Sequence, residues 1–235
     1  MSADALAPTL LERLTAVRAE VAEATRQAGR DPASVRLLAV SKLQPIEAVA
    51  AALAAGQAAF GENYAQELRD KARALPTAEW HFIGPLQRNK VKYVVGVARL
   101  IHSVDGPSLL EEIARRAELM GATQRCLIEV NVGDEQQKAG CLPEDLPQLL
   151  DAARALPEIA LEGLMCIPPP GDAEATRPFF RRLRQLRDDE RARTGLPLPE
   201  LSMGMSADFA AAIAEGATLV RVGTAIFGPR PVKPS

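Results

Sequence analysis

The sequence predicts an α/β fold, a single (β/α)8 TIM barrel preceded by an extra N-terminal helix. Short apolar runs rich in branched residues alternate with segments of helical periodicity along the 235-residue chain. We count eight such runs, and eight parallel strands are the number that closes a barrel. A doubly wound open sheet fits the local patterns also. Against it, no GxGxxG motif follows the first strand, where a dinucleotide-binding turn would need its glycines.

The first helix and the first strand have clear boundaries. Apolar residues recur at helical spacing over Thr9–Ala28, and Gly29 follows as a common residue after a helix C-terminus. The run Val35–Val40 is short, apolar and rich in branched residues, which is typical of a buried strand. This helix therefore precedes the first strand and is additional to the eight strand–helix units.

The remaining elements alternate in the same way. The other predicted strands are Ala58–Phe60, Glu79–Phe82, Leu100–Ser103, Arg125–Val130, Ala160–Leu164, Glu200–Ser202 and Thr218–Val222. The helices predicted between them are Pro45–Ala54, Asn63–Ala74, Gln87–Val95, Pro107–Met120, Pro143–Ala155, Glu174–Thr194 and Ala207–Glu215. No repeat or linker divides the chain, so we expect one domain over residues 1–235. The proline-rich residues 229–235 are expected to form a flexible tail.

Composition excludes several classes of function. A net charge of −2 and an aromatic content of 4% disfavour a nucleic-acid-binding surface. No apolar stretch is long enough to span a bilayer, and the N-terminus lacks the pattern of a secretory signal. The three cysteines form no CxxC pair, so we expect buried thiols. These features predict a cytoplasmic protein without membrane or nucleic-acid partners.

In a barrel of this kind the functional residues lie at the carboxyl ends of the strands, and Lys42 follows the first strand directly. Apolar surroundings disfavour the charged form of a lysine, and a neutral amine can condense with an aldehyde. The alternative is an exposed lysine that begins a loop. Position alone does not decide between them.

Small residues follow the seventh and eighth strands, at the two loops where barrels commonly bind phosphate. Ser206 precedes a predicted helix, Gly204 permits close backbone approach, and Gly223 and Thr224 form a second turn with hydrogen-bond donors. Helix capping by Ser206 alone is the alternative. If the eighth strand pairs with the first, this cradle lies beside Lys42, as a site for a phosphorylated carbonyl compound requires.

Two further side chains are candidates for the same site. Arg221 lies two residues before Gly223 and would donate a hydrogen bond to a pyridine nitrogen and keep it unprotonated, unless it forms a structural salt bridge. Asn63 follows the second strand and could bind a cofactor substituent or cap the next helix. His81 and His102 lack a third metal ligand at suitable spacing, which favours a structural role.

Long motifs around these residues resemble the pyridoxal phosphate homeostasis protein family over nearly the whole chain. The matching motifs are LLAVSK at Leu37–Lys42, FGENYAQE at Phe60–Glu67, WHFIGPLQRNK at Trp80–Lys90, HSVD at His102–Asp105, KAG at Lys138–Gly140, SMGMSADF at Ser202–Phe209 and RVGTAIFG at Arg221–Gly228. Their length makes the resemblance specific.

The resemblance implies a fold-type III barrel, similar to the N-terminal domain of alanine racemase, that acts as a monomer and binds pyridoxal 5′-phosphate (PLP). Lys42 matches the lysine that holds the cofactor as an internal aldimine. Ser206, Gly223 and Thr224 match the phosphate site, Arg221 matches the arginine facing the pyridine nitrogen, and Asn63 matches an asparagine beside the ring. Lys138 matches a lysine of the family, but its role is left open.

The resemblance also implies a role in PLP homeostasis, in which the protein buffers the cofactor and delivers it to apoenzymes without catalysis. A PLP-dependent racemase is the main alternative. Racemases that resemble this barrel use a second, β-rich domain, whereas only about a dozen residues follow the last predicted strand. An arginine beside the pyridine nitrogen also makes a weaker electron sink than an acid. A phosphosugar aldolase with a lysine Schiff base is compatible with the barrel alone.

Overall fold

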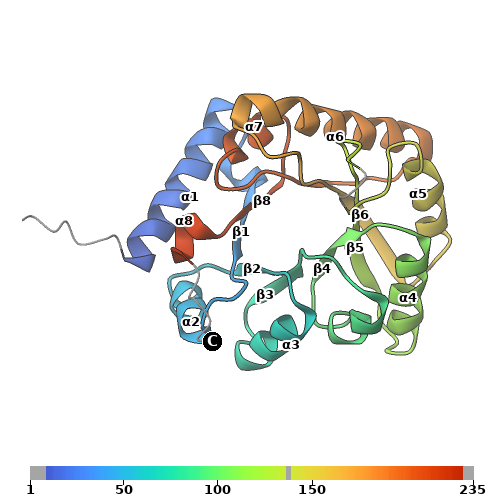
Figure 1. Ribbon diagram of the computed structural model, residues 1–235, viewed down its shortest axis with the longest axis horizontal. Coiled ribbons are helices and arrows are strands. Elements are labelled where there is room, and N and C mark those ends of the chain that lie inside the picture. The colour runs from blue at the N-terminus through green and yellow to red at the C-terminus, as the bar shows by residue number, and fades with distance from the viewer. Residues whose placement is uncertain (1–8, 136–138, 230–235) are drawn as a thin grey trace, which may run out of the picture.

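A computed structural model of the protein describes residues 9–135 and 139–229. Eight parallel strands close into a barrel in chain order, with β8 beside β1, and helices surround it (Figure 1). The predicted (β/α)8 barrel with an additional N-terminal helix is confirmed. Lys138 and the predicted tail beyond residue 229 lie outside the described residues.

The strands agree with the predicted ones to within two residues at each end. They are β1 (Arg36–Val40), β2 (Ala59–Glu62), β3 (Glu79–Phe82), β4 (Leu100–Val104), β5 (Gln124–Glu129), β6 (Ile159–Met165), β7 (Glu200–Ser202) and β8 (Leu219–Val222).

The helices agree less closely at their ends. They are α1 (Leu10–Gln27), α2 (Ile46–Ala54), α3 (Ala65–Ala74), α4 (Pro107–Glu118), α5 (Leu146–Arg154), α6 (Ala173–Thr194), α7 (Phe209–Ala214) and α8 (Thr224–Phe227), with 3₁₀ helices η1 (Pro32–Ser34) and η2 (Arg88–Tyr93). The α-helix expected over Gln87–Val95 is the 3₁₀ helix η2, in which Val91 is the only buried residue. Helix α8 was not predicted, because four residues are too few to show a helical period.

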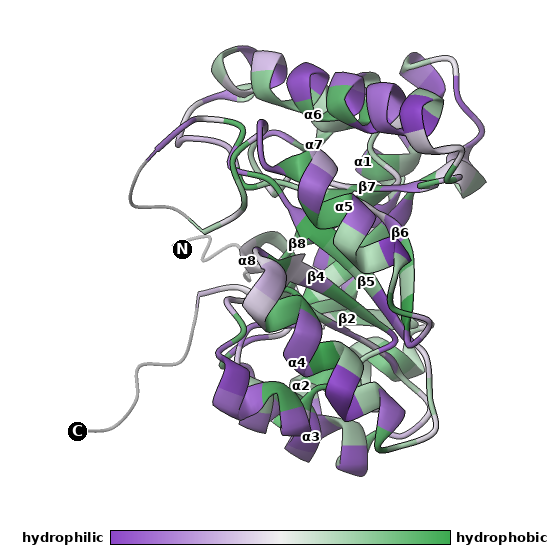
Figure 2. Ribbon diagram, turned by 90° about the vertical axis from the view of Figure 1, so that its right-hand side faces the viewer, coloured by the Kyte–Doolittle hydropathy of each residue, from purple (hydrophilic) through white to green (hydrophobic). Residues whose placement is uncertain are grey.

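Strand side chains are divided between a large outer apolar core and smaller apolar clusters. In β8, Val220 and Val222 pack in the large core between the strands and the helices. Leu219 belongs to a smaller cluster, together with Leu100 and Leu127. Successive side chains of a strand point to opposite faces, so this smaller cluster lies in the barrel interior. Figure 2 shows α6 with alternating hydrophilic and hydrophobic bands, as expected for a helix with one solvated face.

Helix α1 covers the place where the barrel closes. Leu38 pairs with Arg221 and Ala39 with Val222 in the β1–β8 ladder. In Figure 1, α1 lies beside α7 and α8. Arg30 donates hydrogen bonds to the carbonyls of Ile213 and Ala217, at 2.9 and 2.8 Å. The additional helix therefore fastens the first part of the chain to the last strand–helix units.

The cysteines and the helices bear on two expectations that were drawn from the composition. Cys126, Cys141 and Cys166 are buried free thiols, as predicted. Burial raises the pKa of Cys141 and of Cys166 to about 12 in each case, which keeps these thiols protonated. No helix in residues 9–135 and 139–229 combines the length and apolarity needed to cross a membrane.

Candidate cofactor-binding site

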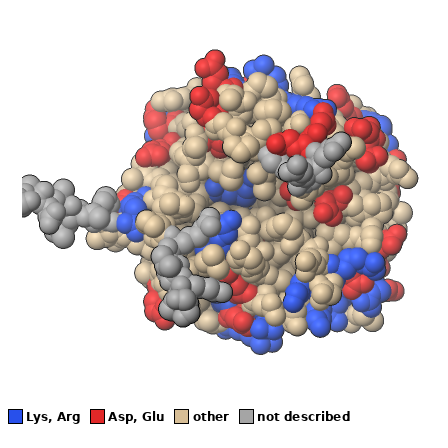
Figure 3. Space-filling view, in the orientation of Figure 1, with Lys and Arg blue, Asp and Glu red and all other residues tan. Residues whose placement is uncertain are grey.

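The six residues predicted from the sequence lie together around one cavity of about 180 Å³. They are Lys42, Asn63, Ser206, Arg221, Gly223 and Thr224. Five of them follow the carboxyl end of a strand, and Arg221 is the penultimate residue of β8. Figure 3 shows Lys and Arg side chains bordering the hollow at the centre of this face. The cavity is therefore at the end of the barrel where such folds carry their functional residues.

Lys42 lies two residues beyond the last residue of β1, in the wall of the cavity and half-buried. The backbone on both sides of it is held in place. Lys71 Nζ donates to the Ser41 carbonyl at 2.6 Å, and the Leu43 N–H donates to Glu67 Oε1 at 2.7 Å. Leu43 has a φ of 61°, a conformation that costs energy for a branched side chain and needs support from its surroundings.

The support beneath Lys42 is a buried polar network. Glu62 is fully buried, and its Oε1 accepts from Ser41 Oγ at 2.7 Å and from Lys71 Nζ at 2.8 Å. Burial raises the pKa of Glu62, while the charge of Lys71 opposes this shift. Since Lys71 also bonds to Glu67 at 2.7 Å, one ammonium group joins β2 and α3 to the backbone beside Lys42.

Arg221 is a buried cation at the floor of the cavity, with 4% of its surface exposed. Its Nη1 donates to Ser202 Oγ at 2.7 Å, and its Nη2 donates to the Cys166 carbonyl at 2.9 Å. No carboxylate within the described ranges forms an ion pair with it. Burial lowers the pKa of Arg221, yet a guanidinium stays charged in proteins. The alternative of a structural salt bridge is thus not what the structure contains.

Ser206 is not a helix cap, and this corrects one alternative. Helix α7 begins later than predicted, at Phe209, and Asp208 precedes it. The Asp208 Oδ1 accepts from the Met205 N–H at 2.6 Å, so the turn is closed by this aspartate. The Ser206 side chain is exposed at the cavity mouth and takes no part in capping.

The loop after β8 lies directly against β1. A Cβ atom added to Gly223 would lie 3.2 Å from the Val40 carbonyl oxygen and 3.3 Å from Val40 Cβ. Both distances are tighter than an ordinary contact, so the lack of a side chain at this position favours the close approach of the loop. Thr224 follows as the first residue of α8 and is exposed at the mouth. Two hydroxyl groups, those of Ser206 and Thr224, are therefore open to a ligand.

Asn63 is held by close packing and leaves one acceptor unused. It does not cap α3, because Tyr64 occupies that position and makes no capping bond through its side chain. A Cβ added to Gly84 would lie 2.4 Å from the Asn63 carbonyl oxygen, so the loop after β3 packs closely against the Asn63 backbone. Its Oδ1 is buried and has no hydrogen-bond partner among the described residues. Such an atom is costly unless a ligand supplies a donor.

Part of the cavity lining was not predicted from the sequence. The other residues are Val40, Gln44, Ile83, Ile167, Met205 and Gly228. Ile167 and Met205 are 42% and 38% exposed, which is unusual for large apolar side chains. No pattern in the sequence distinguishes an apolar residue at a cavity mouth from one in the core. Lys42 and Arg221 are the only ionisable side chains that line the cavity within the described residues.

His81 and His102 do not reach the cavity lining. They lie deeper in the barrel, fully buried, with His81 Nδ1 and His102 Nε2 separated by 2.9 Å. No group of three or more His, Cys, Asp or Glu side chains suited to a metal ion is found in residues 9–135 and 139–229.

Comparison with known proteins places this cavity in a family. The chain matches the alanine racemase N-terminal domain family over residues 13–231. It is 46% identical over 222 residues to the pyridoxal phosphate homeostasis protein of Aquifex aeolicus, covering 93% of this chain and 97% of that protein. The chain belongs to the pyridoxal phosphate homeostasis protein family.

A second relative and two solved structures are also similar to this chain. The pyridoxal phosphate homeostasis protein of Pseudomonas aeruginosa is 45% identical, over 94% of this chain and 96% of that one. The structure of PipY from Synechococcus elongatus with PLP bound has a TM-score of 0.82 at 38% identity, covering 94% of this chain and all of that one. The alanine racemase of Corynebacterium glutamicum has a TM-score of 0.69 at 19% identity, which shows a shared fold alone.

Proposed function

We propose that this protein binds PLP in the cavity at the carboxyl end of its barrel and serves PLP homeostasis, buffering the cofactor and delivering it to apoenzymes. The observation that carries the proposal is the convergence of Lys42, Arg221 and the two exposed hydroxyls on one cavity. The names of the relatives and the PLP-bound structure of PipY support it. Bound PLP supplies an aldehyde, a pyridine ring and a phosphate, and this cavity offers a group for each.

Lys42 is the residue we assign to the aldehyde. Its amine forms a C=N bond with the aldehyde carbon, and the aldehyde oxygen leaves as water. The supported backbone around Ser41 and Leu43 holds the lysine in the cavity wall. Ser206, Gly223 and Thr224 are assigned to the phosphate, since hydroxyl and backbone N–H donors suit its oxygens.

Arg221 and Asn63 are assigned to the ring. An arginine donates a hydrogen bond to a pyridine nitrogen without giving up its proton, so the nitrogen stays unprotonated. The Asn63 Oδ1 lacks a hydrogen-bond partner in residues 9–135 and 139–229 and would accept a hydrogen bond from a ring substituent. The buried guanidinium and the unused amide oxygen both gain a partner when the ring is present.

The cavity favours a carrier over an enzyme. Two-base chemistry needs a second acid or base facing the lysine, but the described lining holds no Tyr, His, Cys, Asp or Glu. An unprotonated pyridine nitrogen also withdraws electrons weakly. A half-buried lysine and exposed hydroxyls at an open mouth suit release of the cofactor to an apoenzyme. We further expect a cytoplasmic monomer, which fractionation and sedimentation would check.

The decisive experiment is a PLP titration followed by absorbance, with borohydride reduction and mass mapping of the modified lysine. We expect the absorbance band of a Schiff base, and a reduced adduct on Lys42 that Lys42→Ala abolishes. Exposed Lys92→Ala is the matched control and should leave band and adduct unchanged. An adduct only on another lysine, or no band, would contradict the assignment.

The delivery role has a separate test. Reactivation of a PLP-dependent apoenzyme should be faster with the loaded protein than with an equal concentration of free PLP. A rate equal to that of free PLP would count against delivery. Amino-acid racemisation that disappears in Lys42→Ala would instead support the racemase alternative.

A further inference from the structure

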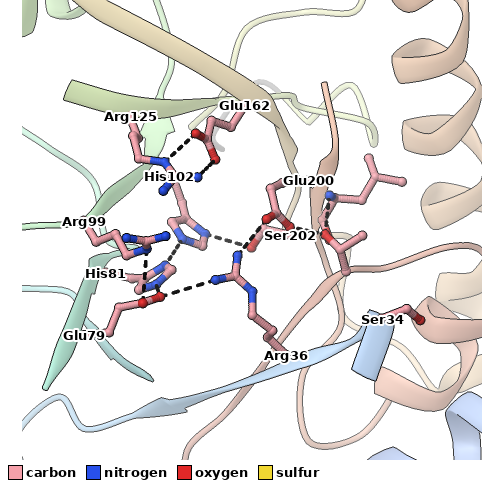
Figure 4. Close-up of polar contacts among 12 residues, drawn as sticks. Ser34, Arg36, Glu79, His81, Arg99, His102, Arg125, Glu162, Glu200 and Ser202 are labelled. Atoms are coloured by element: carbon pink, nitrogen blue, oxygen red, sulfur yellow. Dashed lines mark hydrogen bonds and ion pairs between the residues drawn. The ribbon is translucent and has the colours of Figure 1, made fainter. Parts of the chain in front are cut away.

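A continuous line of hydrogen bonds runs through the barrel interior, from the base of the barrel to Arg221. It begins at Glu79, whose Oε1 lies 2.9 Å from His81 Nε2. His81 Nδ1 lies 2.9 Å from His102 Nε2, and His102 Nδ1 lies 2.8 Å from Ser202 Oγ (Figure 4). Ser202 Oγ then accepts from Arg221 at 2.7 Å.

The line crosses the barrel interior because of strand alternation. Trp80 and Phe82 of β3 and Leu201 of β7 pack in the outer core. Their neighbours His81 and Ser202 therefore face the interior. His81, His102 and Ser202 are all fully buried, so bulk water does not compete for these hydrogen bonds. These three polar side chains occupy space that apolar residues would fill in an ordinary barrel.

The two ends of the line dictate the direction of every bond. A guanidinium can only donate, and an ionised carboxylate can only accept. Arg221 thus donates to Ser202, the Ser202 hydroxyl donates to His102 Nδ1, and His102 Nε2 donates to His81 Nδ1. His81 Nε2 then donates to Glu79. Both histidines are neutral with the proton on Nε2, and every donor meets an acceptor.

The opposite direction leaves two defects when the histidines are neutral. If His102 carried its proton on Nδ1, His81 would have to donate from its own Nδ1. The bare Nε2 of His81 would then face the Glu79 carboxylate, acceptor against acceptor. The Ser202 hydroxyl proton would also have no acceptor among the described residues. An extra proton on His81 would remove only the first defect, and it would place a charge in the barrel interior.

The charges at the base keep Glu79 in its accepting form. Arg99 and Arg36 lie 3.1 and 3.3 Å from its carboxylate, and Arg36 also pairs with Glu200 at 2.7 Å (Figure 4). The hydrogen bond from His81 lowers the pKa of Glu79, and the two arginines lower it further. Burial lowers the pKa of His81 and lowers that of His102 well below its usual range.

We propose that Glu79, His81, His102 and Ser202 form a one-directional positioning chain that fixes the Arg221 guanidinium at the cavity floor. The proposal deepens the proposed function and rests on it, because Arg221 is the residue assigned to the cofactor ring. Ser202 is the critical link, since its hydroxyl oxygen accepts from Arg221 while its hydroxyl proton is donated to His102. None of the four residues lines the cavity, so they act through Arg221 as positioning residues.

The direction of the chain can be read without any cofactor. The protein contains two histidines, so nitrogen-15 NMR of the imidazole rings reports only on this chain. We expect both rings to be neutral with the proton on Nε2 from about pH 6 to 8. A ring with its proton on Nδ1, or a charged ring in that range, would overturn the proposal. This measurement stays valid even if PLP binding at Lys42 is disproved.

The effect on the cofactor is tested with Ser202→Ala. Ser103→Ala is the matched control, because Ser103 is also buried and its Oγ has no hydrogen-bond partner in the part of the chain that the structure describes. For Ser202→Ala we expect a changed His102 Nδ1 resonance, a shifted absorbance maximum of bound PLP and a Kd for PLP raised about tenfold. Ser103→Ala should leave all three at their original values. Wild-type spectrum and Kd in a folded Ser202→Ala would refute the positioning role, whereas failure of the wild-type protein to bind PLP would refute the proposed function alone.

Discussion

At the scale of single residues, the site contains buried polar groups that lack an ion pair or a hydrogen bond within the described residues. The Arg221 guanidinium is buried without an ion pair in the described part of the chain, and the Asn63 Oδ1 is buried without a hydrogen bond. Each of these costs folding free energy in the ligand-free protein. Both costs fall when a ligand with matching groups binds, so the cavity gains binding energy from features that weaken the fold.

We expect Asn63→Ala to weaken cofactor binding without weakening the fold. Removal of an unsatisfied buried acceptor should leave the unfolding free energy of the cofactor-free protein unchanged within about 1 kcal/mol. The Kd for PLP should rise about tenfold, because the ring substituent loses its partner. Calorimetric unfolding and PLP titration check the two parts.

Exposed Asn89→Ala, on η2, is the control and should change neither quantity. A large loss of stability in Asn63→Ala with unchanged PLP affinity would show that Asn63 serves the fold and not the ligand.

At the scale of elements, most of the cavity residues lie in loops, and the strands before these loops fix where the loops begin. Strands β3 and β7 have the predicted boundaries, and the other strands differ by two residues or fewer. The strands are easy to predict because apolar branched residues and a period of two follow directly from burial. Helix ends and short helices such as α8 depend instead on caps and loop contacts that local patterns describe poorly.

Gly204, in the loop after β7, gives a prediction at this scale. It has a φ of 89°, and an added Cβ would lie 2.5 Å from Ala212 Cβ in α7. Gly204→Ala should therefore suffer both backbone strain and overpacking, about 3 kcal/mol of unfolding free energy in total. Denaturant unfolding measures the loss.

Gly29 separates the two causes. It has a φ of 70°, but an added Cβ would meet no heavy atom within 4 Å. Gly29→Ala should lose only the strain contribution, about 1 kcal/mol. Equal losses in the two variants would show that the contact between the loop and α7 is unimportant.

At the scale of the whole molecule, side-chain ion pairs lie at the amino end of the barrel, and the cavity opens at its carboxyl end. Arg36 bridges Glu79 and Glu200, and Arg125 binds Glu162 beside them (Figure 4). These ion pairs lie at the base, where the apolar residues Leu100 and Leu219 begin β4 and β8. The carboxyl end of the barrel holds the cavity. Glu129, the last residue of β5, lies outside the cavity lining and is 6% exposed.

Glu129 makes stability depend on pH. Burial raises its pKa to about 7, the nearby Asp105 adds to the shift, and Arg221 opposes it. The folded protein therefore binds this proton more tightly than the unfolded chain does. The resulting stabilisation is complete below about pH 4.5 and is lost as the pH rises to about 7.

Glu129→Gln should remove this loss. Relative to the wild type, the variant should gain up to about 3 kcal/mol of unfolding free energy between pH 4.5 and 8. Denaturant unfolding at the two pH values measures the difference, with exposed Glu118→Gln as the control. A difference that does not change with pH would exclude a raised pKa at Glu129.

The sequence by itself determined the barrel, the additional helix and the six residues around the cavity. Each of these follows from local information: a period of two marks a strand, and in a closed barrel the residues after the strands share one face. The tertiary structure alone decided that Arg221 is supported by Ser202 and the two histidines instead of a carboxylate. His102 and Ser202 are 100 residues apart and meet only because the curvature of the barrel brings β4 and β7 face to face across its interior. Contacts across the interior depend on strand tilt and register around the whole barrel, and no local pattern encodes them.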